Sequence, residues 1–246
     1  MLKLLKGKFI NFFNIQPFMG IIDFKEILSK KLLNKEMPNH LALATMNFSG
    51  YDEKKAIEKH IALLNELIEF QIKTAIPIFT IHLRQTPEEY KKYLASYIKS
   101  LEHDETISKN QVRIFIIGKW YDLEQDAVEA IKSIMEATKD YDKHFLNLCV
   151  NYDGQEEILG SLKLMARKIQ MEKMNFEELS KEVIKDNLYT SYFIPPDLMI
   201  ETGYQFSGLL LWDSQGAVLH FTRKHWLEFD KKDLEQALER FVKSKS

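Results

Sequence analysis

The stretch Leu146-Asn-Leu-Cys-Val-Asn-Tyr-Asp-Gly-Gln-Glu-Glu-Ile158 runs from an apolar segment through a turn into a helical pattern. Phe145 to Val150 has the length and composition of a buried strand, and Gln155 to Ile169 repeats its apolar residues at helical spacing. A strand followed by a helix is the repeating unit of a parallel sheet, because a parallel pair of strands needs a long crossover. The stretch therefore predicts an α/β protein.

The same alternation continues along the chain. Further strands are predicted at residues 40–46, 76–81, 112–117, 198–200, 209–211 and 218–221. Further helices are predicted at residues 24–37, 51–73, 87–101, 124–139, 175–186 and 231–243. The expected fold is α/β, with a mainly parallel central sheet flanked by helices. Ligands bind such sheets outside the carboxyl ends of the strands, so the loop 47–50 after the first strand is the first candidate site.

Composition restricts the function. The 246 residues carry 34 Lys and Arg against 36 Asp and Glu, a formal net charge of −2, which excludes the basic footprint of a nucleic-acid binder. The single cysteine, Cys149, excludes an intramolecular disulfide framework and favours a reducing, cytoplasmic compartment. Cys149 lies inside an apolar run, where a buried packing role is expected.

The N-terminus is predicted to be a helical extension, residues 1–37, before a single domain at residues 38–246. Residues 1–22 are apolar but carry Lys3, Lys6 and Lys8, with Pro17 inside, so they do not read as a membrane-spanning helix. Two interpretations remain open. The segment packs on the domain as a terminal helix, or it lies at a membrane surface with its lysines against anionic lipid.

Four blocks of sequence resemble the cis-prenyltransferase, or undecaprenyl diphosphate synthase-like, family. Residues 38–50 resemble the first strand of the family and its Met-Asp-Gly-Asn-Gly loop, and residues 146–158 resemble its Leu-Asn-Ile-Ala-Phe-Asn-Tyr-Gly-Gly-Arg-Asp-Glu-Ile stretch. Residues 195–200 match a Pro-Asp-Leu-Leu-Ile-Arg element, and residues 209–230 match the ending with Phe-Leu-Leu-Trp, Tyr-Phe-Thr and Asp-Phe-Asp. The blocks keep the order of the family and cover about residues 38–242.

The resemblance implies a Mg²⁺-dependent addition of isopentenyl diphosphate to an allylic diphosphate, yet the family's functional positions are replaced. Asn47 stands where the family has the Asp that handles the metal–diphosphate, and Phe48 replaces a loop glycine. Glu201 replaces a phosphate-binding Arg, and Val218 replaces a metal-contacting Glu on the side of the neighbouring subunit. An amide, a reversed charge and an apolar side chain cannot do that work.

Two further segments of the family are changed. The Phe-Ser-x-Glu-Asn-Trp segment is replaced by His82-Leu-Arg-Gln-Thr86, and the Arg-x-Ser segment is shortened to residues 202–208, which contain no arginine. By resemblance, the expected substrate-binding positions are Asn47, Phe48, Ser49, Gly50, His82, Arg84 and Ser207. No catalytic residue and no metal ligand are predicted.

This pattern resembles the non-catalytic partner subunits of heteromeric cis-prenyltransferases, which keep the fold and the dimer surface. The expected function is an accessory subunit that dimerises with a catalytic homologue, or with itself, and supports synthesis of long-chain polyprenyl diphosphate. Such partners commonly end in Arg-x-Gly; this chain ends Arg240-Phe-Val-Lys-Ser-Lys-Ser246, so the resemblance does not extend to the tail.

Two alternatives stay open. The first is an active, divergent enzyme, with Mg²⁺, whose phosphate site is rebuilt from His82, Arg84, Arg113 or groups of a neighbouring subunit. The second is a protein that binds a polyprenyl lipid without transferring it. Mg²⁺-diphosphate binding separates the enzyme from the accessory subunit.

Other polar groupings have simpler interpretations. His220 and His225, with Glu228 nearby, are not expected to share one face and so are a weak metal site. Asp52, Glu53 and Glu201 are expected to be a solvated helix start and loop rather than an acidic cluster. Ser49 lacks the glycine context of a nucleophile elbow.

Overall fold

The computed structural model describes residues 37–45, 52–83 and 88–245. Within these residues, six strands form one sheet in the order β3-β4-β2-β1-β5-β6, and every neighbouring pair is parallel. The strands are β1 His40–Ala44, β2 Ile78–Leu83, β3 Val112–Ile117, β4 His144–Val150, β5 Leu198–Thr202 and β6 Val218–Thr222. The predicted parallel α/β sheet is confirmed.

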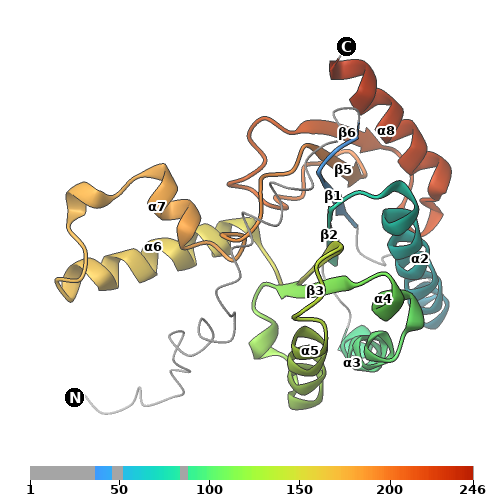
Figure 1. Cartoon of the computed structure of the whole chain (residues 1–246), viewed down its shortest axis with the longest axis horizontal. Helices are drawn as coiled ribbons and strands as arrows, with labels where there is room; N and C mark the ends of the chain where they lie inside the picture. The colour runs from blue at the N-terminus through green and yellow to red at the C-terminus, as the bar shows by residue number, and fades with distance from the viewer. Residues whose placement is uncertain (1–36, 46–51, 84–87, 246) are drawn as a thin grey trace.

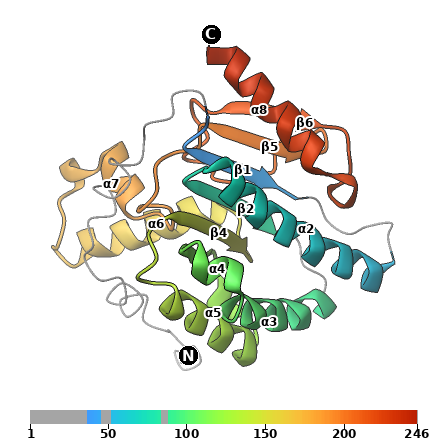
Figure 2. The ribbon, with the colours of Figure 1, turned by 45° about the vertical axis from the view of Figure 1, so that its right-hand side comes forward.

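The helices connect these strands. The α-helices are α2 Glu53–Thr74, α3 Glu88–Glu102, α4 Glu105–Lys109, α5 Gln125–Ala137, α6 Gly154–Gln170, α7 Lys181–Asp186 and α8 Lys231–Lys245, and the 3-10 helices are η3 Trp120–Asp122, η4 Phe176–Glu178 and η5 Trp226–Glu228. Figures 1 and 2 show α2, α3, α5 and α8 together on one side of the sheet. The same figures show α6 and α7 reaching away from the other side.

The two faces of the sheet differ in chemistry because alternate residues of a strand point to opposite faces. The face toward α2, α3, α5 and α8 is apolar, with the buried residues Leu41, Leu43, Phe79, Ile81, Leu146 and Leu148. The opposite face carries the buried polar residues His40, Thr80, His82, Asn147 and Glu201 among smaller apolar ones. Cys149 is fully buried on this second face, as the sequence predicts.

Hydrogen bonds link side chains of the polar face across three strands. The Asn147 amide nitrogen donates to Thr80 Oγ1 over 2.9 Å, and Thr80 Oγ1 lies 2.8 Å from His40 Nε2. His40 Nδ1 lies 2.7 Å from the Ile194 carbonyl oxygen, which can only accept. Nδ1 therefore carries the proton, and Nε2 accepts from the Thr80 hydroxyl, so the ring is held neutral.

Two predicted elements are wrong. Residues 209–211 form turns rather than a strand: Gly208 and Leu210 have φ values of 79° and 46°, and an extended strand cannot contain them. The predicted helix 175–186 is broken into η4 and α7, because Leu179 is extended and Ser180 caps α7 through the Val183 amide. The short helix α4 was not predicted.

The N-terminal predictions lie almost entirely outside the described residues. They concern the helix 24–37, of which only Met37 is described, and the segment 1–22. Within the described residues, no helix is both long and apolar enough to cross a membrane.

Candidate functional site at the carboxyl edge of the sheet

The carboxyl ends of the strands place the candidate site beside β1. The chain proceeds from β1 to β2 on one side, whereas β5 and β6 lie on the other side, so the direction of winding switches at β1. A parallel sheet binds its ligands at such a switch point. The predicted positions Asn47, Phe48, Ser49, Gly50 and Arg84 follow these strands but lie outside the described residues.

Thr45 and His82 join the ends of β1 and β2. The Thr45 amide and hydroxyl both donate to the His82 carbonyl oxygen, over 3.2 and 2.6 Å. On the other flank of β1, the Thr202 hydroxyl donates to the Ala44 carbonyl oxygen over 2.9 Å. Side chains thus fix the three strand ends from which the candidate site would be built.

His82 lies at the carboxyl edge, as expected, but inside the structure. It belongs to β2 rather than to a loop, and only 3% of its surface is exposed. Its Nε2 lies 3.3 Å from the Tyr152 carbonyl oxygen, and the two rings meet edge to face at 5.5 Å. The ring therefore packs under Tyr152.

Glu201 is buried, which corrects the expectation of a solvated carboxylate. It pairs in register with Ala44 and Phe221, and only 1% of its surface is exposed. Its Oε1 accepts from the Ser207 amide over 3.2 Å and from the Ser207 hydroxyl over 2.9 Å. Asp52, by contrast, is exposed and caps α2 through the Lys55 amide, so the two carboxylates have unrelated roles.

Ser207 completes a closed turn. While its hydroxyl donates to Glu201, its Oγ accepts from the Leu209 amide over 3.1 Å. Both donors of Ser207, the amide and the hydroxyl, therefore point to one carboxylate oxygen.

Val218 and Arg113 lie near the amino ends of their strands, on the side of the sheet opposite the carboxyl edge. Val218 begins β6 and packs against the apolar core, four residues or about 13 Å from Thr222 at the carboxyl end. Arg113 pairs with Phe145, whereas His82 pairs with Cys149, which again is a separation of four residues. Arg113 therefore cannot join His82 in a rebuilt phosphate site within one chain.

One described cation at the carboxyl edge is held by a carboxylate. Lys119, in the loop after β3, donates to Glu156 over 2.7 Å, and this hydrogen bond raises the pKa of Lys119. The Lys119 amide also donates to the Asn151 carbonyl oxygen, while the Asn151 side chain donates back to the Lys119 carbonyl oxygen, both over 3.1 Å. The loops after β3 and β4 are thus fastened together.

A buried polar network ties α6 and α7 to the loop after β5. The Tyr152 hydroxyl donates to Glu157 over 2.6 Å, and Glu157 also accepts from the Thr190 amide over 3.3 Å. The Thr190 hydroxyl donates to Asp213 over 2.7 Å, and Lys185 pairs with the same carboxylate at 2.5 Å. Burial raises the pKa of Glu157. Sequence reasoning missed this network, because its members are spread over 62 positions of a chain whose turns were not predicted.

The described residues do not fit a metal ion. No group of three His, Cys, Asp or Glu side chains in them is arranged to hold one. His220 is buried in the middle of β6, whereas His225 caps η5 through the Leu227 amide, so these two rings serve different elements. Glu201 Oε1 already accepts two hydrogen bonds. No reaction step through Mg²⁺ can therefore be assigned to these residues.

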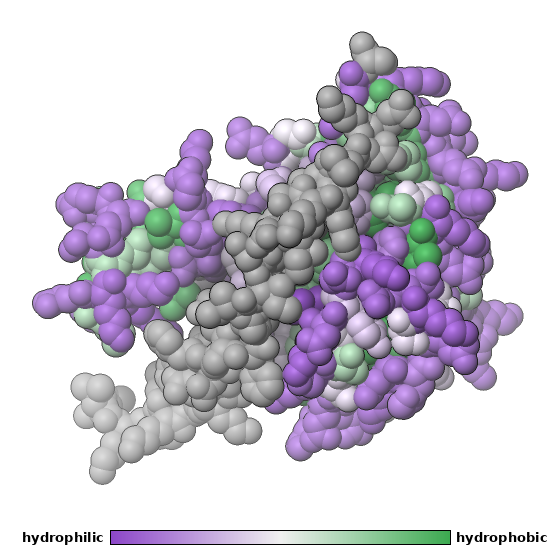
Figure 3. Space-filling view, in the orientation of Figure 1, coloured by the Kyte–Doolittle hydropathy of each residue, from purple (hydrophilic) through white to green (hydrophobic). Residues whose placement is uncertain are grey.

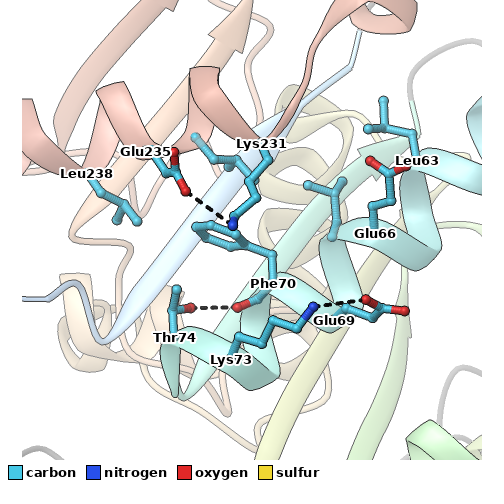
Figure 4. A pocket seen from close by; sticks show the side chains of 11 residues that line it. Leu63, Glu66, Glu69, Phe70, Lys73, Thr74, Lys231, Glu235 and Leu238 are labelled. Carbon is cyan, nitrogen blue, oxygen red and sulfur yellow. Dashed lines mark hydrogen bonds and ion pairs between the residues drawn. The ribbon is translucent and has the colours of Figure 1, made fainter.

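A separate groove of about 330 Å³ lies between α2 and α8 (Figure 4). Its apolar lining, Leu63, Leu67, Phe70, Leu234 and Leu238, is at most 7% exposed. The exposed pairs Lys73–Glu69 and Lys231–Glu235 lie along it. No strand end contributes to the groove, so it is distinct from the carboxyl edge.

Comparison with known families decides the identity of the fold. Residues 47–246 match a family model described as "Putative undecaprenyl diphosphate synthase". The chain belongs to this undecaprenyl diphosphate synthase family. The match covers most of the domain and includes every described strand except β1.

Its relatives in the family are named as prenyl-transferring enzymes. The chain is 28% identical, over 87% of its own length and 90% of the relative, to the tritrans,polycis-undecaprenyl-diphosphate synthase (geranylgeranyl-diphosphate specific) of Thermoplasma acidophilum. It is 25% identical, over 89% of its length and 95% of the relative, to an isoprenyl transferase of Oceanobacillus iheyensis.

A solved structure shares the fold of this chain. Lavandulyl diphosphate synthase from Lavandula x intermedia, in complex with dimethylallyl diphosphate, superposes with a TM-score of 0.76 at 20% identity. The superposition covers 85% of this chain and 97% of the synthase. This chain therefore shares the overall fold of that synthase.

Proposed function

We propose that this chain is a non-catalytic accessory subunit of a cis-prenyltransferase. It would bind a catalytic homologue and support synthesis of long-chain polyprenyl diphosphate from isopentenyl diphosphate and an allylic diphosphate. The observation that carries the proposal is Glu201. A buried carboxylate occupies the position where the family resemblance places a phosphate-binding Arg, and Ser207 is bound to it.

The placement of the other residues supports an accessory role over a rebuilt enzyme. A phosphoryl or diphosphate site needs fixed positive charge near the leaving group. Arg113 lies at the wrong edge of the sheet, and His82 packs against Tyr152. Mg²⁺ and the diphosphate-binding groups would then come from the catalytic partner. The second candidate function is a protein that binds a polyprenyl lipid without transferring it.

Exposed apolar side chains support an interaction role. Leu219 and Phe221 are 45% and 42% exposed on β6, which is an edge strand of the sheet. Phe221 lies beside Glu201 in register, and the Gly203 amide donates to the Thr222 carbonyl oxygen, which holds the start of the loop with exposed Tyr204 and Phe206 against β6. In the view of Figure 3, most of the described surface is hydrophilic. Apolar groups gathered on an open edge favour contact with another protein chain.

The deciding experiment measures prenyl transfer from labelled isopentenyl diphosphate to farnesyl diphosphate with Mg²⁺. The purified chain alone is expected to form no polyprenyl product. Added to a co-expressed catalytic homologue from the same source, it is expected to raise product above the level of the homologue alone. Product formed by the chain alone would overturn the proposal.

The contact can be tested in the same preparation. Phe221→Lys should reduce co-purification with the homologue, because it puts a charge into the apolar surface of β6. Val242→Lys is the matched control, since Val242 is 37% exposed but lies on α8. Equal loss of co-purification in both variants would show that β6 does not take part in the contact.

The domain division at residue 38 and the membrane-surface role of residues 1–22 are part of the same proposal. The lysines and apolar residues of this segment are typical of attraction to anionic lipid. Sedimentation with anionic vesicles measures membrane binding by the full chain and by a chain that lacks residues 1–22. Equal binding by both would show that the segment does not contact the membrane.

A further inference from the structure

Glu201 occupies a position where a ligand is expected. It lies near the carboxyl end of β5, and its register partner Ala44 ends β1, the strand at which the winding of the sheet switches. Ligands of parallel sheets bind in the crevice outside such strand ends. A carboxylate that is 1% exposed at this place is unusual, because a buried charge is costly unless donors surround it.

Two donors to Glu201 come from one loop residue, Ser207. The Ser207 amide and hydroxyl both donate to Oε1, and the Leu209 amide donates to Ser207 Oγ, which leaves the hydroxyl hydrogen for the carboxylate. A main-chain N–H and an O–H that converge on one negatively charged oxygen are the donors that an external oxyanion would also use.

We propose that Glu201 is an internal anion that fills the anion subsite at the end of β5 and excludes phosphate ligands from it. The inference deepens the proposed function by naming the residue that closes the site. Glu201 would exclude a phosphate ligand in two ways. The carboxylate occupies the donors of Ser207, and its negative charge repels a second anion brought within a few ångströms.

Glu201→Gln separates these effects from packing. Glutamine has nearly the same shape and keeps an amide oxygen that can accept from Ser207, but it carries no charge. The full chain is titrated with inorganic pyrophosphate, without metal or isoprenoid, by calorimetry and by following the Ser207 amide in ¹⁵N-labelled protein. The variant is expected to bind at least about tenfold more tightly than the wild type, which is about 1.4 kcal/mol.

Glu157→Gln is the matched control. Glu157 is also a buried carboxylate that accepts from one hydroxyl and one main-chain amide, but on α6, with Tyr152 and Thr190 as donors. The Glu157→Gln substitution removes a buried charge and is expected to leave pyrophosphate affinity unchanged. Adding Ser207→Ala to Glu201→Gln should return the affinity toward the wild-type value, because the hydroxyl donor is then lost.

Three outcomes would overturn the inference. The first is a shift of the Ser207 amide when pyrophosphate is added to the wild type, which can be measured even if no variant folds. The second is equal affinity of Glu201→Gln and Glu157→Gln. The third is a gain in Glu201→Gln that survives Ser207→Ala in full. None of these involves prenyl transfer, so the accessory-subunit proposal can fail while this inference stands, and the reverse.

Discussion

At the scale of single residues, the buried histidines link the fold to pH. Burial lowers the pKa of His40 to about 4 and the pKa of His60 to about 3. The unfolded chain takes up these protons near pH 6.5, whereas the folded chain does not, so acid favours the unfolded state. Stability should be complete above pH 6.5 and fall as the pH approaches 4, by about 1.4 kcal/mol per pH unit for each histidine.

Urea unfolding at pH 7 and pH 4.5 measures this loss. His40→Asn keeps a donor for the Ile194 carbonyl oxygen but does not titrate, so the difference between the two pH values should shrink by about 2 kcal/mol or more. His103→Asn is the control, since His103 is exposed in the turn that follows α3. An unchanged difference in His40→Asn would show that His40 titrates normally in the folded chain.

Sequence reasoning predicted the identity of Glu201 but not its surroundings. The match of residues 195–200 to the family's Pro-Asp-Leu-Leu-Ile-Arg element shows that Glu201 replaces an Arg, but it does not show that Glu201 is buried. Its partner Ser207 lies six positions later in a loop, and only the loop geometry brings both Ser207 donors to Oε1. Arg113 is different: the predicted strand 112–117 already places it second, at the amino end, so the sequence alone could have excluded it from the site.

At the scale of elements, α6 offers a comparison within one helix. A Cβ at Gly154 would lie 2.2 Å from the Gly208 carbonyl oxygen and 2.7 Å from Leu211 Cβ, so the helix start and the loop after β5 could no longer meet. A Cβ at Gly160 would have nothing within 4 Å. Gly154→Ala should destabilise the chain by about 1–3 kcal/mol, and Gly160→Ala should stabilise it by about 0.5–1 kcal/mol.

Thermal unfolding of both variants measures this difference. A chain of this length should show a shift of about 2–4 °C for each kcal/mol, with opposite signs for the two glycines. Shifts of the same sign would mean that α6 and the loop at Gly208 are not in close contact.

The elements that were mispredicted are those shaped by such contacts. Residues 209–211 are apolar enough for a strand, and Leu209 and Leu210 are indeed buried, but they are buried in turns over the polar face of the sheet. The long apolar strands and amphipathic helices were predicted well, because their period of two or 3.6 residues is written in the local sequence. A turn built around the left-handed residues Gly208 and Leu210 has no such period.

At the scale of the whole molecule, the sequence predicted a parallel sheet but not its strand order. The order β3-β4-β2-β1-β5-β6 depends on which strands pair over long distances, and that order is what brings Ala44, Glu201 and Phe221 side by side. Val218 and Arg113 lie at the amino ends of their strands, so the parallel register places both far from the carboxyl edge. The replaced family positions are therefore spread over both edges of the sheet rather than grouped at one repairable point.

This spread predicts that no single reversion restores prenyl transfer. Asn47→Asp, Glu201→Arg and Val218→Glu each correct one position and leave the other two wrong, so each purified variant should stay without product in the labelled isopentenyl diphosphate assay with Mg²⁺. Circular dichroism confirms that each variant is folded. Anion binding and turnover should separate, because Glu201→Gln removes the charge that repels pyrophosphate without supplying a metal ligand. Turnover by any one of the three single variants would show that the site is blocked at one residue and otherwise intact.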